Sequence, residues 1–408
     1  MGDIYSKLLL LLAAVTAINV TPLVPSTVDT LPERDMAQEE TVREQPVLSQ
    51  ADVERVLEEV MQTHSAVAVS AAVIEYGEPS ASGAWGWAVK GERKMTPDTK
   101  MRIASLSKIA VGLCAMSMAE EGIVNIDAPI SDYWGASVKN PYRTTQPSIR
   151  TLMTHTSSLK TLNIQSGLST LRAILSRSDS WRDMEPGNGG YWAYNNFGFC
   201  VLGTTLELAS GKVLDTYFQE RFAEPLEMTA SFHAGTLPAQ ELAALYDASG
   251  VMTRSVATQA GYQRPTEAGR GASFYPGGLV ISAVDLAKLV SVLANDGVYE
   301  NNRLLSANAI AEMERAYFAV PQSDGAPPFE QCLVLRRQDD LFGQSTLRYH
   351  TGSAYGVYSL ISYNPETGDG VIVLTTGAPL SKEEHGIYTL CAELSQRLYA
   401  VMSEKRNA

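Results

Sequence analysis

Hydrophobic and polar positions follow a helical period where the folded part of the chain begins. Ser49 is a good N-cap residue with Asp52 three positions later. Apolar residues then recur at the spacing of one helix face: Val53, Val56, Leu57, Val60 and Met61. The same kind of pattern predicts helices over 197–210 (ending at Gly211), 213–222, 283–294 (capped by Ser282) and about 381–403.

Short runs of apolar and β-branched residues predict strands near both ends of the chain. They cover 67–75, 81–89 (after a Gly77–Pro79 turn), 331–337, 346–350, 355–364 and 370–376. Strands joined by short turns should be antiparallel. The expected fold is α/β (α+β): one antiparallel sheet built from both termini, flanked by helices, with a mostly helical subdomain inserted. The sheet subdomain is predicted at about 49–100 and 275–403, the helical subdomain at about 101–274, and a tail at 404–408.

The first 48 residues differ in composition from the rest of the chain, with an apolar run followed by a segment rich in proline and acidic residues. Lys7 precedes an apolar run of about a dozen residues, which is short of the ~20 needed to span a bilayer. Residues 1–25 therefore predict a secretory signal, with an uncleaved N-terminal membrane anchor as the alternative. Residues 26–48 are rich in proline and acidic side chains, and they predict a disordered linker. The expected location is secreted or extracytoplasmic.

Composition narrows the classes of partner. The 408-residue chain is 45% hydrophobic and carries a net charge of −13, which argues against nucleic acid because binding a phosphate backbone needs a basic surface. The five His and four Cys show no metal-ligand spacing. The cysteines lie in separate apolar segments and are expected to be buried thiols, with a single disulfide left open.

One stretch combines an apolar helix with a single charge. From 103 to 119 that charge is Lys108, and a helix is expected to begin near Ser105 as its N-cap and to end before Gly122. Burial and the first-turn position both lower a lysine pKa, and Ser105 lies one helical turn away. A neutral amine beside a serine describes an activated nucleophile. The alternative is a simple cap with a snorkelling lysine, and the 157–160 segment repeats the Ser-x-x-Lys pattern without an apolar helix.

Two further segments carry candidate chemistry. Tyr194 and Asn196 lie in a Gly-rich loop before the 197–210 helix, where a phenol can relay protons and an amide can hold a carbonyl. His350 and Gly352 lie on a predicted strand, and a glycine there permits close backbone approach to a ligand. A lone histidine of this kind is ordinarily a satisfied core residue.

In this order, Ser105–Lys108, Tyr194–Asn196 and His350–Ser353 resemble the three motifs of the serine β-lactamase and penicillin-binding-protein superfamily. The nearest branch is the class C β-lactamase-like one, with its D,D-peptidase, esterase and D-aminopeptidase relatives. The likeness extends from about 49 to 400 and includes the 152–157 segment. There the family has a structural element, so the resemblance assigns the 157–160 segment, and His155 with it, a structural role.

The resemblance implies acyl transfer through an acyl-enzyme at Ser105, without metal or cofactor. Lys108 takes the serine proton, and Tyr194 passes protons to the leaving group; how the two divide the base role stays open. Asn196 positions Lys108 and substrate. The backbone N–H groups of Ser105 and Ser353 form the oxyanion hole. The expected partner is a small-molecule or peptide substrate, and the oligomeric state is left open.

The third motif departs from lactam-hydrolysing relatives, which have lysine where this chain has His350. An unperturbed histidine is mostly neutral at neutral pH, which favours esters or D-amino-acid amides over substrates with a carboxylate beside the scissile bond. Arg348 faces the same side of the strand and could restore the charge. The alternatives are therefore a D,D-carboxypeptidase or weak class C-type β-lactamase, and a ligand sensor that deacylates slowly.

Overall fold

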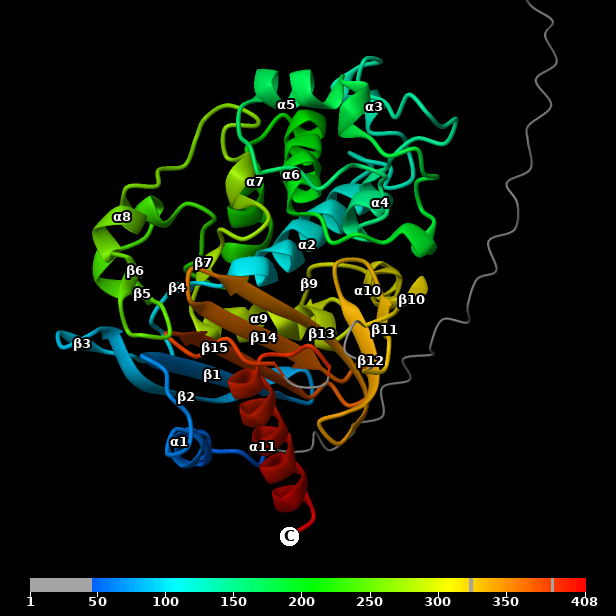
Figure 1. The fold of residues 1–408 in the computed structure, drawn as a ribbon. Coiled ribbons are helices and arrows are strands. Elements are labelled where there is room, and N and C mark those ends of the chain that lie inside the picture. Colours follow the sequence, from blue (N-terminus) through cyan, green and yellow to red (C-terminus); the bar gives the residue numbers. More distant parts are fainter. Residues whose placement is uncertain (1–45, 323–325, 383–384) are drawn as a thin grey trace, which may run out of the picture. The chain divides into compact units, whose positions relative to one another are not determined.

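The computed structural model describes residues 46–322, 326–382 and 385–408. Within these ranges nine strands form one sheet in the order β10-β11-β12-β13-β14-β15-β1-β2-β3, and all its neighbouring strands are antiparallel (Figure 1). Its strands are β1 Ala68–Glu75, β2 Glu78–Val89, β3 Arg93–Lys94, β10 Phe318–Val320, β11 Phe329–Gln331, β12 Arg336–Leu341, β13 Gln344–Ala354, β14 Val357–Tyr363 and β15 Gly370–Thr376. The predicted sheet of both termini is confirmed.

Three strand pairs lie outside this sheet. They are β4 Met101–Arg102 with β7 Val280–Ile281, β5 Leu245–Tyr246 with β6 Met252–Arg254, and β8 Val298–Tyr299 with β9 Asn302–Arg303. The helices are α1 Gln50–Val60, α2 Ser107–Glu120, α3 Ser131–Trp134, α4 Ile149–Met153, α5 Leu168–Leu175, α6 Asn196–Ser210, α7 Leu214–Phe218, α8 Val256–Ala260, α9 Ala283–Ala294, α10 Ala307–Glu314 and α11 Thr389–Arg406. Most of α2 to α8 forms the helical part seen above the sheet in Figure 1.

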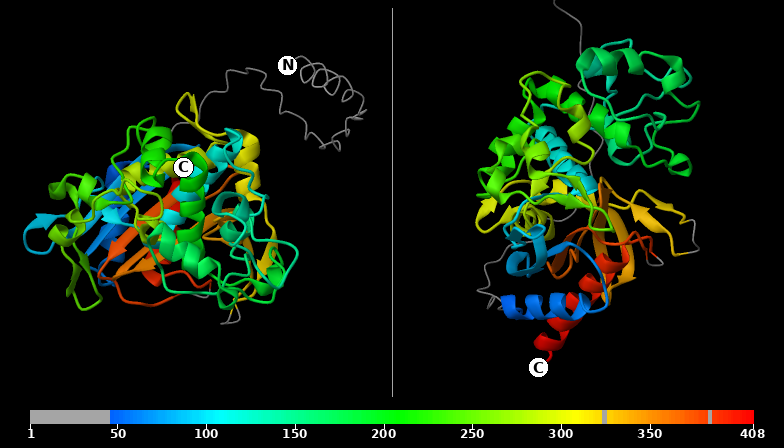
Figure 2. Two further views of the ribbon diagram at one scale, coloured as in Figure 1. Left: turned by 90° about the horizontal axis from the view of Figure 1, so that it is seen from above. Right: turned by 60° about the vertical axis from the view of Figure 1, so that its left-hand side comes forward.

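Helices cover both faces of the sheet. Along β1, Val69 and Val73 pack with α1 and α11, whereas Ala68 and Ala72 pack with the core on the side of α2 and α9. This alternation is the period of two that a strand imposes on its side chains. Figure 2 shows α1 (blue) and α11 (red) together on one face. Because both faces are covered, every residue of β1 is buried.

Helix ends that carried clear capping signals are confirmed. Ser49 and Asp52 form a capping box at the start of α1. Ser282 caps α9, whose observed bounds equal the predicted ones. Gly211 ends α6 in the left-handed conformation that glycine adopts without steric cost.

Several predicted boundaries are wrong. The first hairpin turns at Tyr76–Gly77, and Glu78 and Pro79 already belong to β2. The predicted strand 331–337 covers the end of β11, a loop and the start of β12. The last helix begins at Thr389 and not near 381. At the predicted linker's end, the N–H groups of Val47 and Leu48 donate to the buried Glu75 carboxylate, so these residues belong to the folded unit. Residues 1–25 and most of the linker lie outside the described residues.

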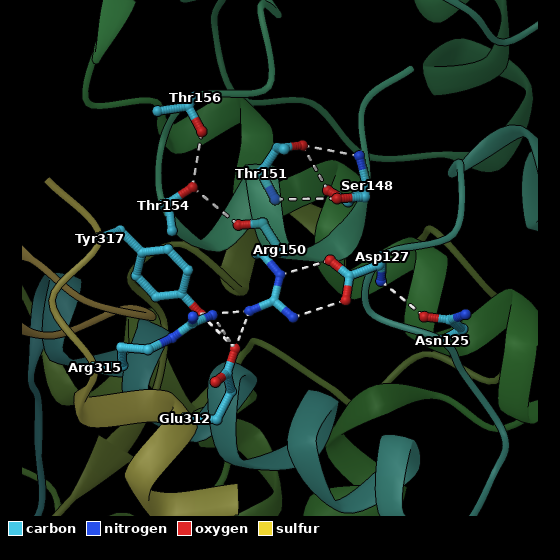
Figure 3. A network of polar contacts seen from close by, with 10 residues as sticks. All are labelled: Asn125, Asp127, Ser148, Arg150, Thr151, Thr154, Thr156, Glu312, Arg315 and Tyr317. Carbon is cyan, nitrogen blue, oxygen red and sulfur yellow. Dashed lines mark hydrogen bonds and ion pairs between the residues drawn. The ribbon is translucent and has the colours of Figure 1, made fainter. Parts of the chain in front are cut away.

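A polar network joins α4 in the helical part to α10 beside the sheet (Figure 3). The Arg150 guanidinium donates two hydrogen bonds to Asp127, at 2.6 and 2.7 Å, and also contacts Glu312. Such bidentate pairs fix geometry as well as adding energy. The Arg150 carbonyl accepts the Thr154 hydroxyl at 3.0 Å. The network therefore holds the segment that leads directly to His155.

Within the described ranges no single helix has the length and apolar character that a membrane crossing requires. Asn196–Ser210 and Leu214–Ala223 reach that length and apolar character only when taken together, as a pair bent by 76°.

Helix α6 packs closely on Tyr275 through Gly203, and this contact gives a stability prediction. A Cβ at Gly203 lies 2.1 Å from the buried Tyr275 ring, whereas a Cβ at Gly198 in the same helix meets its neighbours at 3.6 Å or more. Gly203→Ala should lower the free energy of unfolding by ~1–3 kcal/mol through overpacking. Gly198→Ala should be neutral or stabilising by up to ~1 kcal/mol, because alanine is the better helix former. Urea unfolding of both variants measures this, and equal stabilities contradict the packing account.

Candidate active site

Ser105 lies in a tight turn that precedes α2. Residues Ala104–Leu106 form a 3-10 turn and α2 begins at Ser107, so the prediction that Ser105 is the N-cap is wrong. The Ser107 hydroxyl instead donates to the Ala104 carbonyl at 2.6 Å and accepts the Leu279 N–H at 2.9 Å. A 3-10 turn satisfies the first backbone groups without a side-chain cap. The Ser105 hydroxyl is thereby left for Lys108.

Lys108 is fully buried and forms two short polar contacts. Its Nζ lies 3.0 Å from the Ser105 Oγ and donates to the Pro276 carbonyl at 2.6 Å. The rings of Tyr194 and Phe199 lie with their centroids 5.0 and 5.2 Å from the amine. Burial lowers the pKa of Lys108, and the neighbouring Tyr194 only partly offsets this. A neutral amine can accept the serine proton across this contact.

Strand β13 packs directly against the turn that carries Ser105. A Cβ at Gly352 lies 2.5 Å from the Ile103 carbonyl oxygen and 3.2 Å from the Ser105 nitrogen, so a larger residue does not fit without a shift. The Ser359 hydroxyl on β14 donates to the same Ile103 carbonyl at 2.9 Å. Ser353, the next residue on β13, lines the same cavity as Ser105. The glycine therefore lets β13 approach the turn that carries Ser105 closely. The approach of a ligand to Gly352 stays a prediction.

His155 supports Tyr194. The two ring centroids are 4.4 Å apart, and the His155 Nδ1 accepts the Asn195 backbone N–H at 3.1 Å. Burial lowers the pKa of His155 well below its ordinary value, so the ring is neutral. Asn195 caps α6 with its side chain. The exposed Asn196 begins the helix and lines the cavity beside Ser105, which gives it access to a substrate.

His350 lies on β13 near Tyr194, at 6.4 Å between ring centroids. It is buried, and its Nδ1 donates to the Thr351 carbonyl at 2.7 Å. Burial, with repulsion from Arg336, lowers the pKa of His350 well below its ordinary value. The imidazole is therefore neutral and provides no fixed cation at this position.

Arg348 is directed to α10. Its Nε donates to the Glu314 carbonyl at 3.1 Å and its Nη1 to the Thr346 hydroxyl at 3.1 Å. Sequence reasoning missed Arg336, whose charge acts on both Lys108 and His350. The sequence could have indicated Arg336 only through the predicted 331–337 strand, whose bounds were wrong. Arg336 is the first residue of β12 and pairs with Tyr349 on β13.

A cleft of about 410 Å³ opens beside Ser105. It is lined by Arg102, Ala104, Ser105, Ile164, Asn196, Ser273, Pro276, Gly277, Ser353, Ala354 and Tyr355. Of the predicted site residues, this wall contains Ser105, Asn196 and Ser353. Lys108 lies beneath Ser105 and next to Tyr194, so the structure brings the three motifs together.

The second Ser-x-x-Lys segment has a different setting. Ser157 is buried in a loop after α4, where its carbonyl accepts the Ser158 hydroxyl at 2.5 Å, and Leu159 pairs with Trp181 as a β-bridge. The segment therefore lacks a helix that could align its serine and lysine. The four cysteines are all buried and unpaired.

Burial of Lys108 gives a prediction for stability. The folded state holds the pKa of Lys108 below its unfolded value, so the unfolded chain binds more protons between these two values and stability rises with pH across that window. Lys108→Met removes the free-energy cost of burying the amine and should raise the free energy of unfolding at neutral pH by ~1–2 kcal/mol. Replacing an active-site residue that is unfavourable for stability often has an effect of this size. The gain should shrink towards pH ~10.4. Urea unfolding as a function of pH, with the exposed Lys139→Met as control, measures it; a gain that grows with pH contradicts the assignment.

Comparisons with known proteins show the family to which the chain belongs. The Beta-lactamase family matches residues 53–394. The D-alanyl-D-alanine-carboxypeptidase/endopeptidase AmpH of Escherichia coli (strain K12) is 30% identical over 32% of this chain and 36% of its own length. The teichoic acid D-alanine hydrolase of Staphylococcus aureus (strain MRSA252) is 28% identical over 40% of each chain. The chain therefore spans well under half the length of these two curated relatives.

Solved structures share the fold across nearly the whole described chain. The D-amino acid amidase of Ochrobactrum anthropi SV3 superposes with a TM-score of 0.66 at 22% identity, covering 87% of this chain and 98% of its own. A class C β-lactamase from Rhodobacter sphaeroides gives a TM-score of 0.65 at 18% identity, over 88% and 99% of the two chains. Given the match over most of its length, this chain belongs to the Beta-lactamase family of serine hydrolases.

Proposed function

We propose that the protein hydrolyses esters or D-amino-acid amides and peptides through an acyl-enzyme at Ser105. The observation that carries this proposal is the 3.0 Å contact between the Ser105 hydroxyl and a fully buried lysine amine. Burial favours the neutral amine, which is the form able to take a proton.

The reaction begins with attack of the Ser105 Oγ on the substrate carbonyl while its proton passes to Lys108. The backbone N–H groups of Ser105 and Ser353 stabilise the resulting oxyanion, a contribution of ~3 kcal/mol for a donor of this kind. Tyr194, beside Lys108, passes a proton to the leaving group, and the acyl-enzyme forms. Water then attacks the carbonyl of the acyl-enzyme and gives a proton to Tyr194, while Lys108 returns its proton to the Ser105 oxygen. This step releases the acid and restores Ser105.

The substrate class is argued from the third motif and from the relatives. His350 is held neutral, which disfavours a carboxylate buried beside the leaving group. The names of AmpH, the teichoic acid D-alanine hydrolase and the D-amino acid amidase have a D-amino acid in common. A D-amino-acyl ester or amide therefore suits this site. We place the activity outside the cytoplasm, because residues 1–25 have the pattern of a signal or anchor.

The name of AmpH favours a second candidate, a D,D-carboxypeptidase. A weak class C-type β-lactamase belongs to the same alternative. A sensor that acylates and deacylates slowly is the remaining alternative. Acyl-enzyme lifetimes separate them: the hydrolase clears its acyl group within its turnover time, whereas the sensor keeps it.

The nucleophile assignment is tested by covalent labelling. A fluorophosphonate should label the wild type, and Ser105→Ala should abolish the labelling because the activated hydroxyl is lost. Ser157→Ala serves as the matched control from the second Ser-x-x-Lys segment and should label normally. Labelling that survives in Ser105→Ala and disappears in Ser157→Ala contradicts the proposal.

The role of His350 is tested by substrate preference. Wild-type kcat/KM for a neutral D-alanyl ester should exceed that for benzylpenicillin or a D-Ala-D-Ala peptide by about tenfold or more, since an unpaired carboxylate is costly to bury. His350→Lys should narrow this ratio by raising turnover of the carboxylate substrates. Arg348→Ala is the control, because Arg348 is held at α10. Wild-type preference for the carboxylate substrates that is lost in Arg348→Ala establishes the second candidate instead.

A further inference from the structure

Two arginines lie next to the Tyr355 ring, and one of them, Arg102, lines the cleft beside Ser105. The guanidinium carbon of Arg102 lies 4.9 Å from the ring centroid and that of Arg254 lies 4.1 Å from it. Arg102 lines the cleft, and its Nε donates to the Gly277 carbonyl at 2.6 Å. That bond fixes the guanidinium plane and uses one of its five N–H donors. The arrangement presents a planar cation on the wall of the cleft.

Neither of these two arginines has an acidic partner within the described part of the chain. The partly buried Arg150, Arg264 and Arg406 each pair with a carboxylate. Among the residues that the structure describes, neither Arg102 nor Arg254 forms an ion pair with an acidic side chain. In a chain of net charge −13, Arg102 on the cleft wall and Arg254 next to the same tyrosine ring form a positive site without an acidic counter-charge in the described ranges.

The backbone of Tyr355 is strained. Ala354 pairs with Val357, so Tyr355 and Gly356 form a two-residue hairpin turn, and both have positive φ, at 56° and 83°. Such turns strongly prefer Asn, Asp or Gly at their first position, and a bulky residue there is an outlier. Tyr355 is nevertheless 38% exposed. The contacts of the ring explain why a tyrosine occupies this position, since aromatic faces stack on guanidinium groups such as those of Arg102 and Arg254.

The turn is also fixed to the strand that carries Arg254. The Thr253 hydroxyl on β6 donates to the Tyr355 carbonyl at 2.7 Å. A Cβ at Gly356 lies 1.8 Å from the carbonyl oxygen of Tyr246 on β5, so the turn packs directly on that hairpin. Arg254 is thus positioned by the same contacts that position Tyr355.

The reaction geometry decides which part of a substrate meets these arginines. The leaving group faces Tyr194, which passes it a proton, and neither Tyr194 nor His350 lines the cleft, whereas Arg102 and Tyr355 do. The other substituent of the reacting carbonyl, the acyl part, then lies along the cleft. We propose that Arg102 and Arg254 form a subsite for a carboxylate or phosphate group carried on the acyl part of the substrate.

The subsite rests on the proposed function and specifies its substrate class further, as one with an anionic group on the acyl part. Guanidinium groups bind carboxylate and phosphate through paired N–H donors. The neutral His350 lies on the leaving-group side, so the two sides of the scissile bond have different charge preferences. The expected substrates have a neutral group near the leaving atom and an anionic end on the acyl side.

The test compares chromogenic esters that differ only in charge. Three para-nitrophenyl esters carry an acyl chain ending in a carboxylate, in a phosphonate, or in the neutral methyl ester of the carboxylate. A fourth has a neutral acyl chain and a carboxylate on the nitrophenol ring. The readout is the ratio of kcat/KM for each anionic ester to that for the neutral one. The two acyl-side anions distinguish carboxylate from phosphate chemistry.

The wild type should prefer at least one acyl-side anion by about tenfold, the usual scale for a hydrogen bond to a charged group, and should not prefer the leaving-side anion. Arg254→Gln and Arg102→Gln should each reduce the acyl-side ratio by about tenfold, while Arg254→Lys should retain part of it. Arg55→Gln on α1 changes the net charge equally, at an exposed position, and should not change the ratio. If Arg102→Gln fails to fold, Arg254→Gln decides alone.

The outcomes separate the two proposals. An acyl-side ratio near one in the wild type, or one that falls no more in Arg254→Gln than in Arg55→Gln, overturns the subsite. Ser105-dependent turnover of the neutral ester in that same experiment still supports the proposed hydrolase. Absence of Ser105-dependent turnover for every ester overturns the hydrolase, and the subsite with it.

Discussion

Burying the amine of Lys108 without its charge is the constraint on which the rest of the site depends. The surroundings stabilise the neutral form: apolar helix α2 on one side, the rings of Tyr194 and Phe199 on another, and one backbone carbonyl, that of Pro276, as acceptor. A carboxylate in place of that carbonyl would hold the amine charged. Burying the amine destabilises the folded state through desolvation. Because burial also favours the neutral amine, Lys108 can take a proton from Ser105 near neutral pH.

Close backbone packing holds the reacting groups in place. The turn that carries Ser105 lies against β13 at Gly352, and Ala104 in that turn has a positive φ of 52°. Positive φ at a residue other than glycine is sparsely populated and persists only where surrounding contacts impose it. Strand β13 belongs to the C-terminal half of the sheet, whereas the turn follows its N-terminal half. A sheet built from both termini is therefore what brings the first and third motifs together.

Sequence reasoning succeeded where a local pattern determines a local structure. The cap of α9 at Ser282 and the left-handed end of α6 at Gly211 follow from single residues with known preferences. The juxtaposition of the three motifs came from resemblance, because no periodicity reports contacts across the chain. The role of Pro276 was not predictable, since a backbone carbonyl has no side-chain signature. Arg102 stacks on Tyr355, far away in the sequence, and only the fold reveals that contact.

The most direct test of this account is the pKa of Lys108 itself. With lysines labelled at Cε with carbon-13, the Lys108 signal is assigned by its absence from the spectrum of Lys108→Met and is followed as a function of pH. The account predicts that Lys108 titrates below the ordinary lysine value of ~10.4, because burial disfavours its charged form. A Lys108 signal that titrates at or above the ordinary value would show a charged amine at neutral pH and contradict its role as the base for Ser105.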